Sequence, residues 1–217
     1  MWRAVGGRWQ AGRMKKLLGS TFLLLALLAP LHAAGPERPA ILKEPADWRF
    51  EGMAIPPGFA PDVKLSGSEE IRFAPGMFDT RSSNYFTYVV VILADGAPEL
   101  GAVEIKEFLE KYYRGLSTAV GRGKGLSPDA GQMKAVVTPS PPSPDAKKRF
   151  VAEVVFFDSF SDGRKINLHV EAVVVPRAAS KQTCLIMLVS PSAKDAAAWQ
   201  ALREIGSKAA RNARGAN

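Results

Sequence analysis

The sequence predicts an α+β domain with a mainly antiparallel sheet of about seven strands and two principal helices, an arrangement that an α/β/α sandwich would satisfy. Three observations support this fold class. Between Phe150 and Val175, apolar residues alternate on either side of Asp162-Gly163, which is typical of a long β-hairpin. The segments 85–93 and 182–189 are apolar at consecutive positions, as expected of central strands covered on both faces. Two other segments repeat apolar residues every three or four positions, as amphipathic helices do.

The first strands are predicted at residues 48–53 and 69–73. Between them, the Pro-rich run 56–61 favours irregular structure, because proline has a fixed φ and no N–H to donate. Directly after the second strand, Ala74-Pro75-Gly76 predicts a type II turn, since Pro suits its second position and Gly its third. A polar loop then leads to the doubly apolar strand 85–93.

A helix is predicted to begin at Pro98 or Glu99 and to end before Gly121. Its apolar stripe consists of Ile105, Phe108, Leu109, Tyr112, Leu116 and Ala119. The GRGKG run at 121–125 lacks the phosphate-binding spacing and does not follow a strand, so it is interpreted as a helix-terminating loop. Residues 132–138 are predicted to form a strand, followed by a stiff Pro-rich connection at a sheet edge.

The hairpin register follows from a two-residue turn at Asp162-Gly163, in which the numbers of opposed residues sum to 325. One face is then predicted to be core, with Glu153 as its single misfit: Val151, Val155, Phe157, Ile166, Leu168, Val170, Ala172 and Val174. The other face is mixed, with Asp158 opposite Asn167 and Phe156 opposite His169. We expect the mixed face to be partly solvated.

The chain is predicted to close with a strand at 182–189 and a helix that starts at Pro191-Ser192. Ser192 is the predicted N-cap, because its hydroxyl could accept a hydrogen bond from the first turn. The apolar stripe of this helix consists of Trp199, Leu202, Ile205 and Ala209. We expect the basic tail 211–217 to be frayed.

The first 33 residues are predicted to be an N-terminal extension and a signal peptide. Met14-Lys15-Lys16 forms a basic n-region, an apolar run covers 17–29, and Pro30 and small residues follow. That run is shorter than the ~20 residues of a membrane span. We expect translation to start near Met14 and cleavage to follow Ala33 or Ala34, with an uncleaved interfacial anchor as the alternative. The mature chain would be exported, to the periplasm or beyond.

The mature chain divides into three predicted parts. Residues 34–47 are Pro-rich without periodicity and are expected to be a flexible linker. Residues 48–210 are expected to form a single α+β domain, and 211–217 the basic tail. The formal charge of +8 falls once residues 1–33 are removed, because 24 basic then face 21 acidic side chains. This balance does not favour nucleic-acid binding.

The mature sequence is poorly supplied with metal ligands and redox groups. Its one cysteine, Cys184, lies in an apolar run, so it is interpreted as a small buried hydrophobe, with a reactive or intermolecular thiol as the alternative. A chain with one cysteine has no internal disulfide. His169 is its one histidine, and no EF-hand spacing is present. We expect no metal and no cofactor.

Candidate catalytic residues are few. In the predicted register His169 lies diagonal to Asp158, close enough for an Asp-His contact. A hydrolase would also need a serine, but the G-x-S-x-G motif is absent, and a histidine on a half-solvated strand is the alternative. Glu153 and Glu171 would lie on opposite faces and could not act as a carboxylate pair.

These observations favour an exported, non-catalytic domain that binds an envelope or extracellular partner protein or a small ligand. The candidate contact surface combines Pro-rich loops with the mixed hairpin face: Phe59, Met77, Phe78, Phe156, Asn167 and His169. Two alternatives remain, a hydrolase that uses His169 and Asp158, and a carrier of an apolar ligand between sheet and helices.

Two resemblances add expectations. The WRFE run (48–51) and the EEIRFAPGMF run (69–78) resemble exported bacterial proteins of unassigned function, over residues 48–208. The order of elements resembles the topology of PsbP/Mog1-like domains, which are α/β/α sandwiches. Neither resemblance implies catalytic residues, and a fold does not determine a function.

Overall fold

The computed structural model describes residues 36–143 and 148–215. All structural statements below refer to these residues. The predicted extension and signal peptide (1–33) lie outside them, as do the last two residues of the predicted basic tail.

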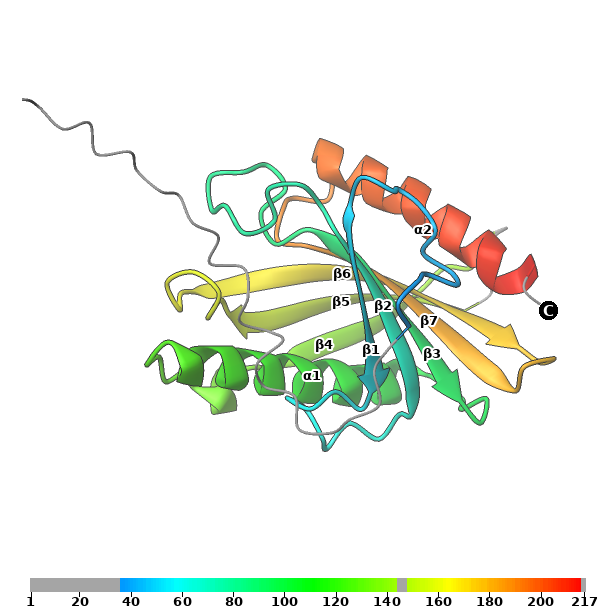
Figure 1. Ribbon diagram of the computed structural model, residues 1–217, viewed down its shortest axis with the longest axis horizontal. Coiled ribbons are helices and arrows are strands. Elements are labelled where there is room, and N and C mark those ends of the chain that lie inside the picture. Colours follow the sequence, from blue (N-terminus) through cyan, green and yellow to red (C-terminus); the bar gives the residue numbers. More distant parts are fainter. Residues whose placement is uncertain (1–35, 144–147, 216–217) are drawn as a thin grey trace, which may run out of the picture. The chain divides into compact units, whose positions relative to one another are not determined.

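Seven antiparallel strands form one sheet in the order β1-β2-β3-β7-β6-β5-β4 (Figure 1). The strands are β1 (Arg49–Ile55), β2 (Gly67–Phe73), β3 (Tyr88–Asp95), β4 (Ala135–Ser140), β5 (Lys148–Phe157), β6 (Lys165–Arg177) and β7 (Gln182–Ser190). The helices are α1 (Ala102–Gly123), α2 (Ala197–Gly215) and a short 3-10 turn, η2 (Ala130–Gln132). The predicted α+β fold is confirmed.

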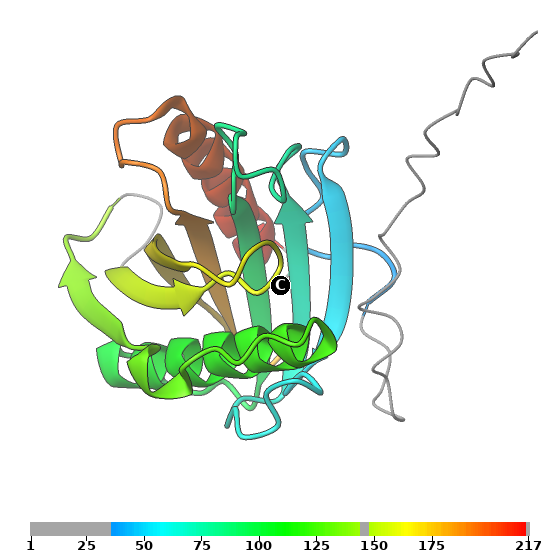
Figure 2. The same ribbon diagram turned by 90° about the vertical axis from the view of Figure 1, so that its left-hand side faces the viewer.

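The two long helices cover opposite faces of the sheet (Figures 1 and 2). The side of α1 that includes Ile105 and Leu109 packs into one buried cluster, and the side of α2 that includes Trp199 and Leu202 packs into another. The layers are therefore helix, sheet and helix. The α/β/α sandwich that the sequence allows is therefore the arrangement of this chain.

The central strands β3 and β7 explain the doubly apolar segments of the sequence. Along β3, Val90 and Ile92 belong to the α1-side core, whereas Val89 and Val91 belong to the α2-side core. Because successive side chains of a strand point to opposite faces, such a strand must be apolar throughout.

The predicted hairpin exists, but its register is different. Phe156 pairs with Ile166 and Glu153 with His169, so opposed numbers sum to 322 instead of 325. The connection comprises residues 158–164, not two turn residues. The register differs by three residues, and a shift by an odd number moves all side chains of one strand to the opposite face of the sheet. Thus Phe150, Ala152, Val154 and Phe156 form the core, and Glu153 is an exposed residue.

The turn at Ala74-Pro75-Gly76 is confirmed, because the N–H of Met77 donates to the carbonyl of Ala74 and Gly76 has a φ of 83°. The helix starts are corrected. α1 begins at Ala102, and the Glu104 carboxylate accepts the N–H of Gly101 at 2.9 Å. α2 begins only at Ala197, so Ser192 is no N-cap; its carbonyl instead accepts the indole N–H of Trp199.

The C-terminal boundary is also corrected. The sequence predicts a frayed tail from Arg211, but α2 continues to Gly215. Ala213 is fully buried against the sheet, and its carbonyl accepts the Nε–H of Arg177 on β6. The extra turn is therefore held by packing as well as by helical hydrogen bonds.

The largest correction concerns the predicted linker 34–47. Residues 36–48, here called the strap, are docked beside α2, with Ile41 and Leu42 buried in the α2-side core. The strap runs so close to the edge strand that a Cβ at Gly52 would lie 2.1 Å from the carbonyl oxygen of Pro36. The strap covers the β1–β2 side of the sheet that α2 does not reach.

Two buried side chains of β2 bind the backbone of the strap. The Glu70 carboxylate accepts the N–H groups of Ala40, Ile41 and Leu42 at 2.7–3.0 Å. The Arg72 guanidinium donates to three strap carbonyls, those of Leu42, Lys43 and Trp48. Residues without periodicity are thus ordered by partners that lie elsewhere in the chain.

Candidate functional site

Part of the sheet is covered by α1 on one face only. On the opposite face, α2 packs on β3, β6 and β7, and the side chains that β4 and β5 turn to this side stay exposed or half-buried. We call this surface the open face; it consists of Val136, Thr138, Arg149, Val151, Glu153, Val155, Phe157, Lys165, Asn167 and His169. Figure 2 shows β4 at one edge of the sheet and β1 at the other.

The open face mixes apolar and charged groups. Val136 has an exposed fraction of 66%, one of the two highest among the large apolar residues of the described chain. Val151 and Val155 are half-buried and belong to neither core cluster. Arg149 and Lys165 lie near the two ends of the β5–β6 pair, and the Glu153–His169 pair lies between Val151 and Val155, so charged groups both border and divide the apolar ones.

His169 lies on the open face with a different partner from the predicted one. Its Nδ1 is 2.9 Å from Oε1 of Glu153, directly across the β5–β6 ladder. Both side chains are partly exposed. The pair follows from the observed register, in which opposed numbers sum to 322. The predicted register, with a sum of 325, would place Glu153 and His169 on opposite faces.

Asp158 is buried at the start of the β5–β6 connection and meets other residues. Its carboxylate accepts the hydroxyls of Tyr85 and Ser161 and the N–H of Phe160. The structure therefore does not join His169 and Asp158 by a hydrogen bond. Asp158 shapes a loop, in which Tyr85 also lies under the guanidinium of Arg164 at 5.1 Å.

The other predicted contact residues divide between core and loop. Met77 and Phe156 are buried in the α1-side cluster. Phe59 and Phe78 are half-buried and pack against the same cluster. Asn167 and His169 alone among the predicted set lie on the open face, which corrects the predicted surface.

The outer edge of β4 has few free hydrogen-bond donors. The N–H of Val155 donates to the carbonyl of Lys134 at 2.9 Å, so the odd residues of β4 turn their backbone groups away from β5. Of these, Ala135 donates its N–H to Glu110 at 3.1 Å, and Pro139 has none. Within the described residues, the N–H of Val137 is therefore the outward-pointing backbone donor of β4 that remains.

One end of the open face borders α2. Arg203 forms a bidentate ion pair with Glu171 on β6, with a shortest distance of 2.6 Å. Glu171 and Glu153 lie on the same face of the sheet, whereas the sequence predicts opposite faces. Each has its own partner: Arg203 binds Glu171, and His169 binds Glu153.

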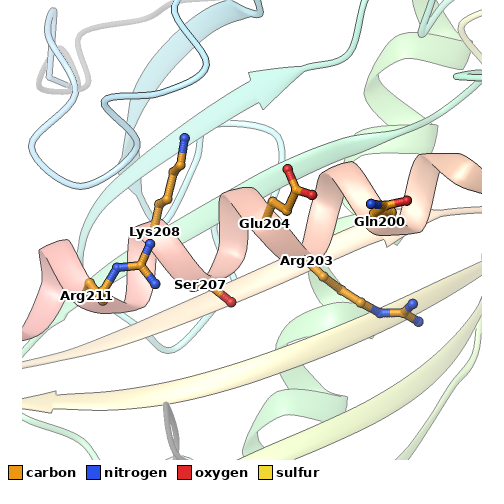
Figure 3. A pocket seen from close by; sticks show the side chains of 6 residues that line it. All are labelled: Gln200, Arg203, Glu204, Ser207, Lys208 and Arg211. Atoms are coloured by element: carbon orange, nitrogen blue, oxygen red, sulfur yellow. The ribbon is translucent and has the colours of Figure 1, made fainter.

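An open depression of about 590 Å³ lies on the outer surface of α2. It is lined by Gln200, Arg203, Glu204, Ser207, Lys208 and Arg211 (Figure 3). Figure 3 shows Arg203 pointing to the side opposite Glu204 and Lys208. Lys208 is bound to Glu44 of the strap at 2.6 Å, so this charged surface is partly neutralised.

Other chemistries find little support in the described residues. They contain no group of three or more His, Cys, Asp or Glu side chains placed to hold a metal ion. None of their helices is both long and apolar enough to cross a membrane. Cys184 is fully buried, and burial raises the pKa of its thiol to about 12, so the thiolate is scarce at neutral pH.

Sequence reasoning missed Val136, Val151 and Val155 as surface residues. Both the odd and the even positions of 150–157 include apolar residues, so the sequence pattern does not show which set of side chains faces the core. A usable signal is Glu153, because a charged side chain is rarely buried without a partner.

No family model, curated protein or solved structure matches this chain. The functional proposal therefore depends on the geometry of the described residues.

Proposed function

We propose that this protein is an exported, non-catalytic domain whose open face binds a partner protein. The observation that carries the proposal is a strand surface with exposed and half-buried valines next to α2, outside both cores. Exposed apolar groups framed by charges are typical of protein contact sites.

The geometry favours a protein over a small ligand. A sheet face offers area, whereas small molecules bind in concave pockets that enclose them. The two cores are filled by buried side chains from sheet and helices, which speaks against an apolar ligand carried between them. The described depression lies outside them and has a polar and charged lining.

The open face also suggests the chemistry of the partner. Arg149 and Lys165 border it, whereas Glu153 already binds His169. A complementary surface would be apolar with acidic side chains at its rim. Because the β4 edge has so few free donors, the partner would dock by side chains, not by adding a strand.

Val136 and Val103 provide a matched pair for testing the proposal. Both are highly exposed valines, but Val103 lies on α1, on the other side of the sheet. A protein captured from the envelope fraction would be purified and titrated calorimetrically against both variants. We expect Val136→Arg to weaken binding at least about tenfold and Val103→Arg to leave it unchanged. Equal binding by both variants would contradict the open face as the site.

Export has a separate test. Mass spectrometry of the protein from the periplasm or medium should find an N-terminus at Ala34 or Gly35. A mature product that retains Trp9 would contradict removal of the leader.

A further inference from the structure

A second feature, independent of the open face, is the side chain of Glu69 at the interface between β2 and α1. Glu69 has no exposed surface. The hydroxyl of Tyr112 on α1 donates to its Oε1 at 2.7 Å. Its Oε2 has no hydrogen-bond partner among the described residues. Unpaired buried oxygens are rare, so this atom requires an explanation.

Beside its apolar cross-strand neighbours Met53 and Ile92, the titratable groups that face Glu69 are acids or phenols. Glu51 of β1 is its diagonal neighbour on the same face, and Tyr112 and Tyr113 of α1 and Tyr88 of β3 complete the surroundings. Each phenol is engaged: Tyr112 with Glu69, and Tyr113 with Tyr88.

The basic side chains of β1, segment 56–66 and α1 that have described partners on this side of the molecule bind groups other than Glu69. Lys111 donates to the carbonyl of Asp62 and pairs with Glu107, and Lys64 also pairs with Glu107. Arg49 pairs with Glu51 at 3.6 Å. Within the described residues, no cation forms a hydrogen bond or ion pair with Glu69.

Burial raises the pKa of Glu69 to about 8, partly offset by the hydrogen bond from Tyr112 and reinforced by the charge of Glu51. Burial likewise raises the pKa of Glu51. A carboxyl with a pKa of about 8 is mostly protonated at neutral pH, and Oε2 is the oxygen left to carry the proton, because Oε1 accepts the hydroxyl of Tyr112.

Segment 56–66 packs on the α1 residue that binds Glu69. It crosses the middle of α1, where the ring of Phe59 meets Tyr112 edge-on at 5.1 Å. A Cβ at Gly115 would lie 2.2 Å from the carbonyl of Phe59, so the segment touches the helix backbone. Next to it, β1 is an edge strand. Solvent would reach an ionised Glu69 by displacing this segment.

We propose that Glu69 is a proton-controlled latch, which holds segment 56–66 and β1 against α1 when protonated and releases them when it loses its proton. A buried carboxylate without a counter-charge costs free energy, and this cost falls when water enters and hydrates the carboxylate. The released segment would expose Phe59 and Tyr112. The latch adds regulation at a site separate from the open face.

The sign of the pH effect follows from linkage. Between about pH 4.5 and about pH 8 the folded state holds a proton that the unfolded chain has lost, so stability falls as pH rises. Glu69 alone would lower the folding equilibrium constant about tenfold per pH unit inside that window. Glu69→Gln keeps the shape and the acceptor for Tyr112 but cannot ionise.

Hydrogen exchange with mass spectrometry, corrected for the intrinsic pH dependence of exchange, tests the latch. Between pH 6.5 and 9.0 we expect protection in 56–66 to fall at least about tenfold in the wild type and to stay constant in Glu69→Gln. Equal changes in both proteins, or no change in the wild type, would overturn the proposal.

A second measurement keeps the test valid if Glu69→Gln does not fold. Carbon-13 NMR of labelled glutamate side chains in the wild type should show one carboxyl with a midpoint near pH 8, coupled to the Tyr112 resonance. Exposed Glu104 serves as the control. If all carboxyls titrate near their ordinary pKa, Glu69 is ionised at neutral pH and the latch is excluded.

Discussion

Glu69 and Glu70 are neighbours on β2, yet they point to opposite faces of the sheet and have different surroundings. Glu69 faces phenols and another acid, with one oxygen unpaired. Glu70 faces the strap and accepts three backbone N–H groups. Two glutamates of equal burial therefore have different partners, a single phenol for Glu69 and three backbone N–H groups for Glu70.

The first prediction concerns Glu70. We expect Glu70→Ala to lower the free energy of unfolding by about 3 kcal/mol, because it leaves three N–H groups of the strap without their acceptor. Urea denaturation followed by fluorescence measures the loss. Glu37→Ala, at an exposed position of the same strap, is the control and should have little effect. Similar losses for both would mean that Glu70 does not hold the strap.

At the scale of elements, the β5–β6 hairpin shows why strands are easier to predict than their register. The sequence favours a two-residue turn at Asp162-Gly163, but Asp158 initiates a seven-residue connection instead. Its partner Tyr85 is 73 positions away in the chain, so no local pattern announces the contact. The observed connection combines this long-range contact with local hydrogen bonds from Phe160 and Ser161 to Asp158.

The register makes a second prediction with a matched pair. Val154 has an exposed fraction of 1%, whereas adjacent Val155 points to the open face. We expect Val154→Asn to cost about 3 kcal/mol, because it buries an amide in an apolar core, and Val155→Asn to cost less than about 1 kcal/mol. Chemical denaturation of both variants distinguishes the registers. The reverse order would restore the register with a sum of 325.

For the whole molecule, α2 and the strap together close one core, and α1 with segment 56–66 closes the other. The fold class, the doubly apolar strands and the stripe of α2 are predictable from the sequence, because burial imposes periodicity. The predicted stripe of α1 is correct as far as Tyr112, but beyond it Ser117 and Gly121 are buried, whereas the predicted Leu116 and Ala119 are half-buried. The strap is not predictable, since Ile41 and Leu42 lie in a segment without a clear period. The last turn of α2 is only weakly marked, because Ala213 continues the four-residue spacing of the stripe but its small side chain gives little hydrophobic signal. The open face is predictable only in part. The alternation of side chains along the strands predicts that one face of the hairpin mixes apolar and charged groups, but the register decides which residues lie on that face.

A third prediction uses Cys184 as a reporter of global opening. Because the thiol is buried in the α2-side core with its pKa raised to about 12, it should react with a thiol reagent only through unfolding. We expect native labelling to be at least about 1,000-fold slower than labelling in denaturant. The time course of absorbance with an aromatic disulfide gives both rates. Rapid, stoichiometric reaction of the native protein would show that the α2 layer opens locally.

The scarcity of free N–H donors at the outer edge of β4 has a consequence for aggregation. Exposed strand edges act as templates on which other chains add β-structure, and natural proteins suppress this with prolines and with caps on N–H groups. Here Glu110 and Pro139 do so. A double variant, Glu110→Ala with Pro139→Val, should form thioflavin-positive aggregates sooner than the parent at equal concentration. We therefore expect the carboxylate of Glu110, together with Pro139, to protect the molecule from polymerising through its own sheet.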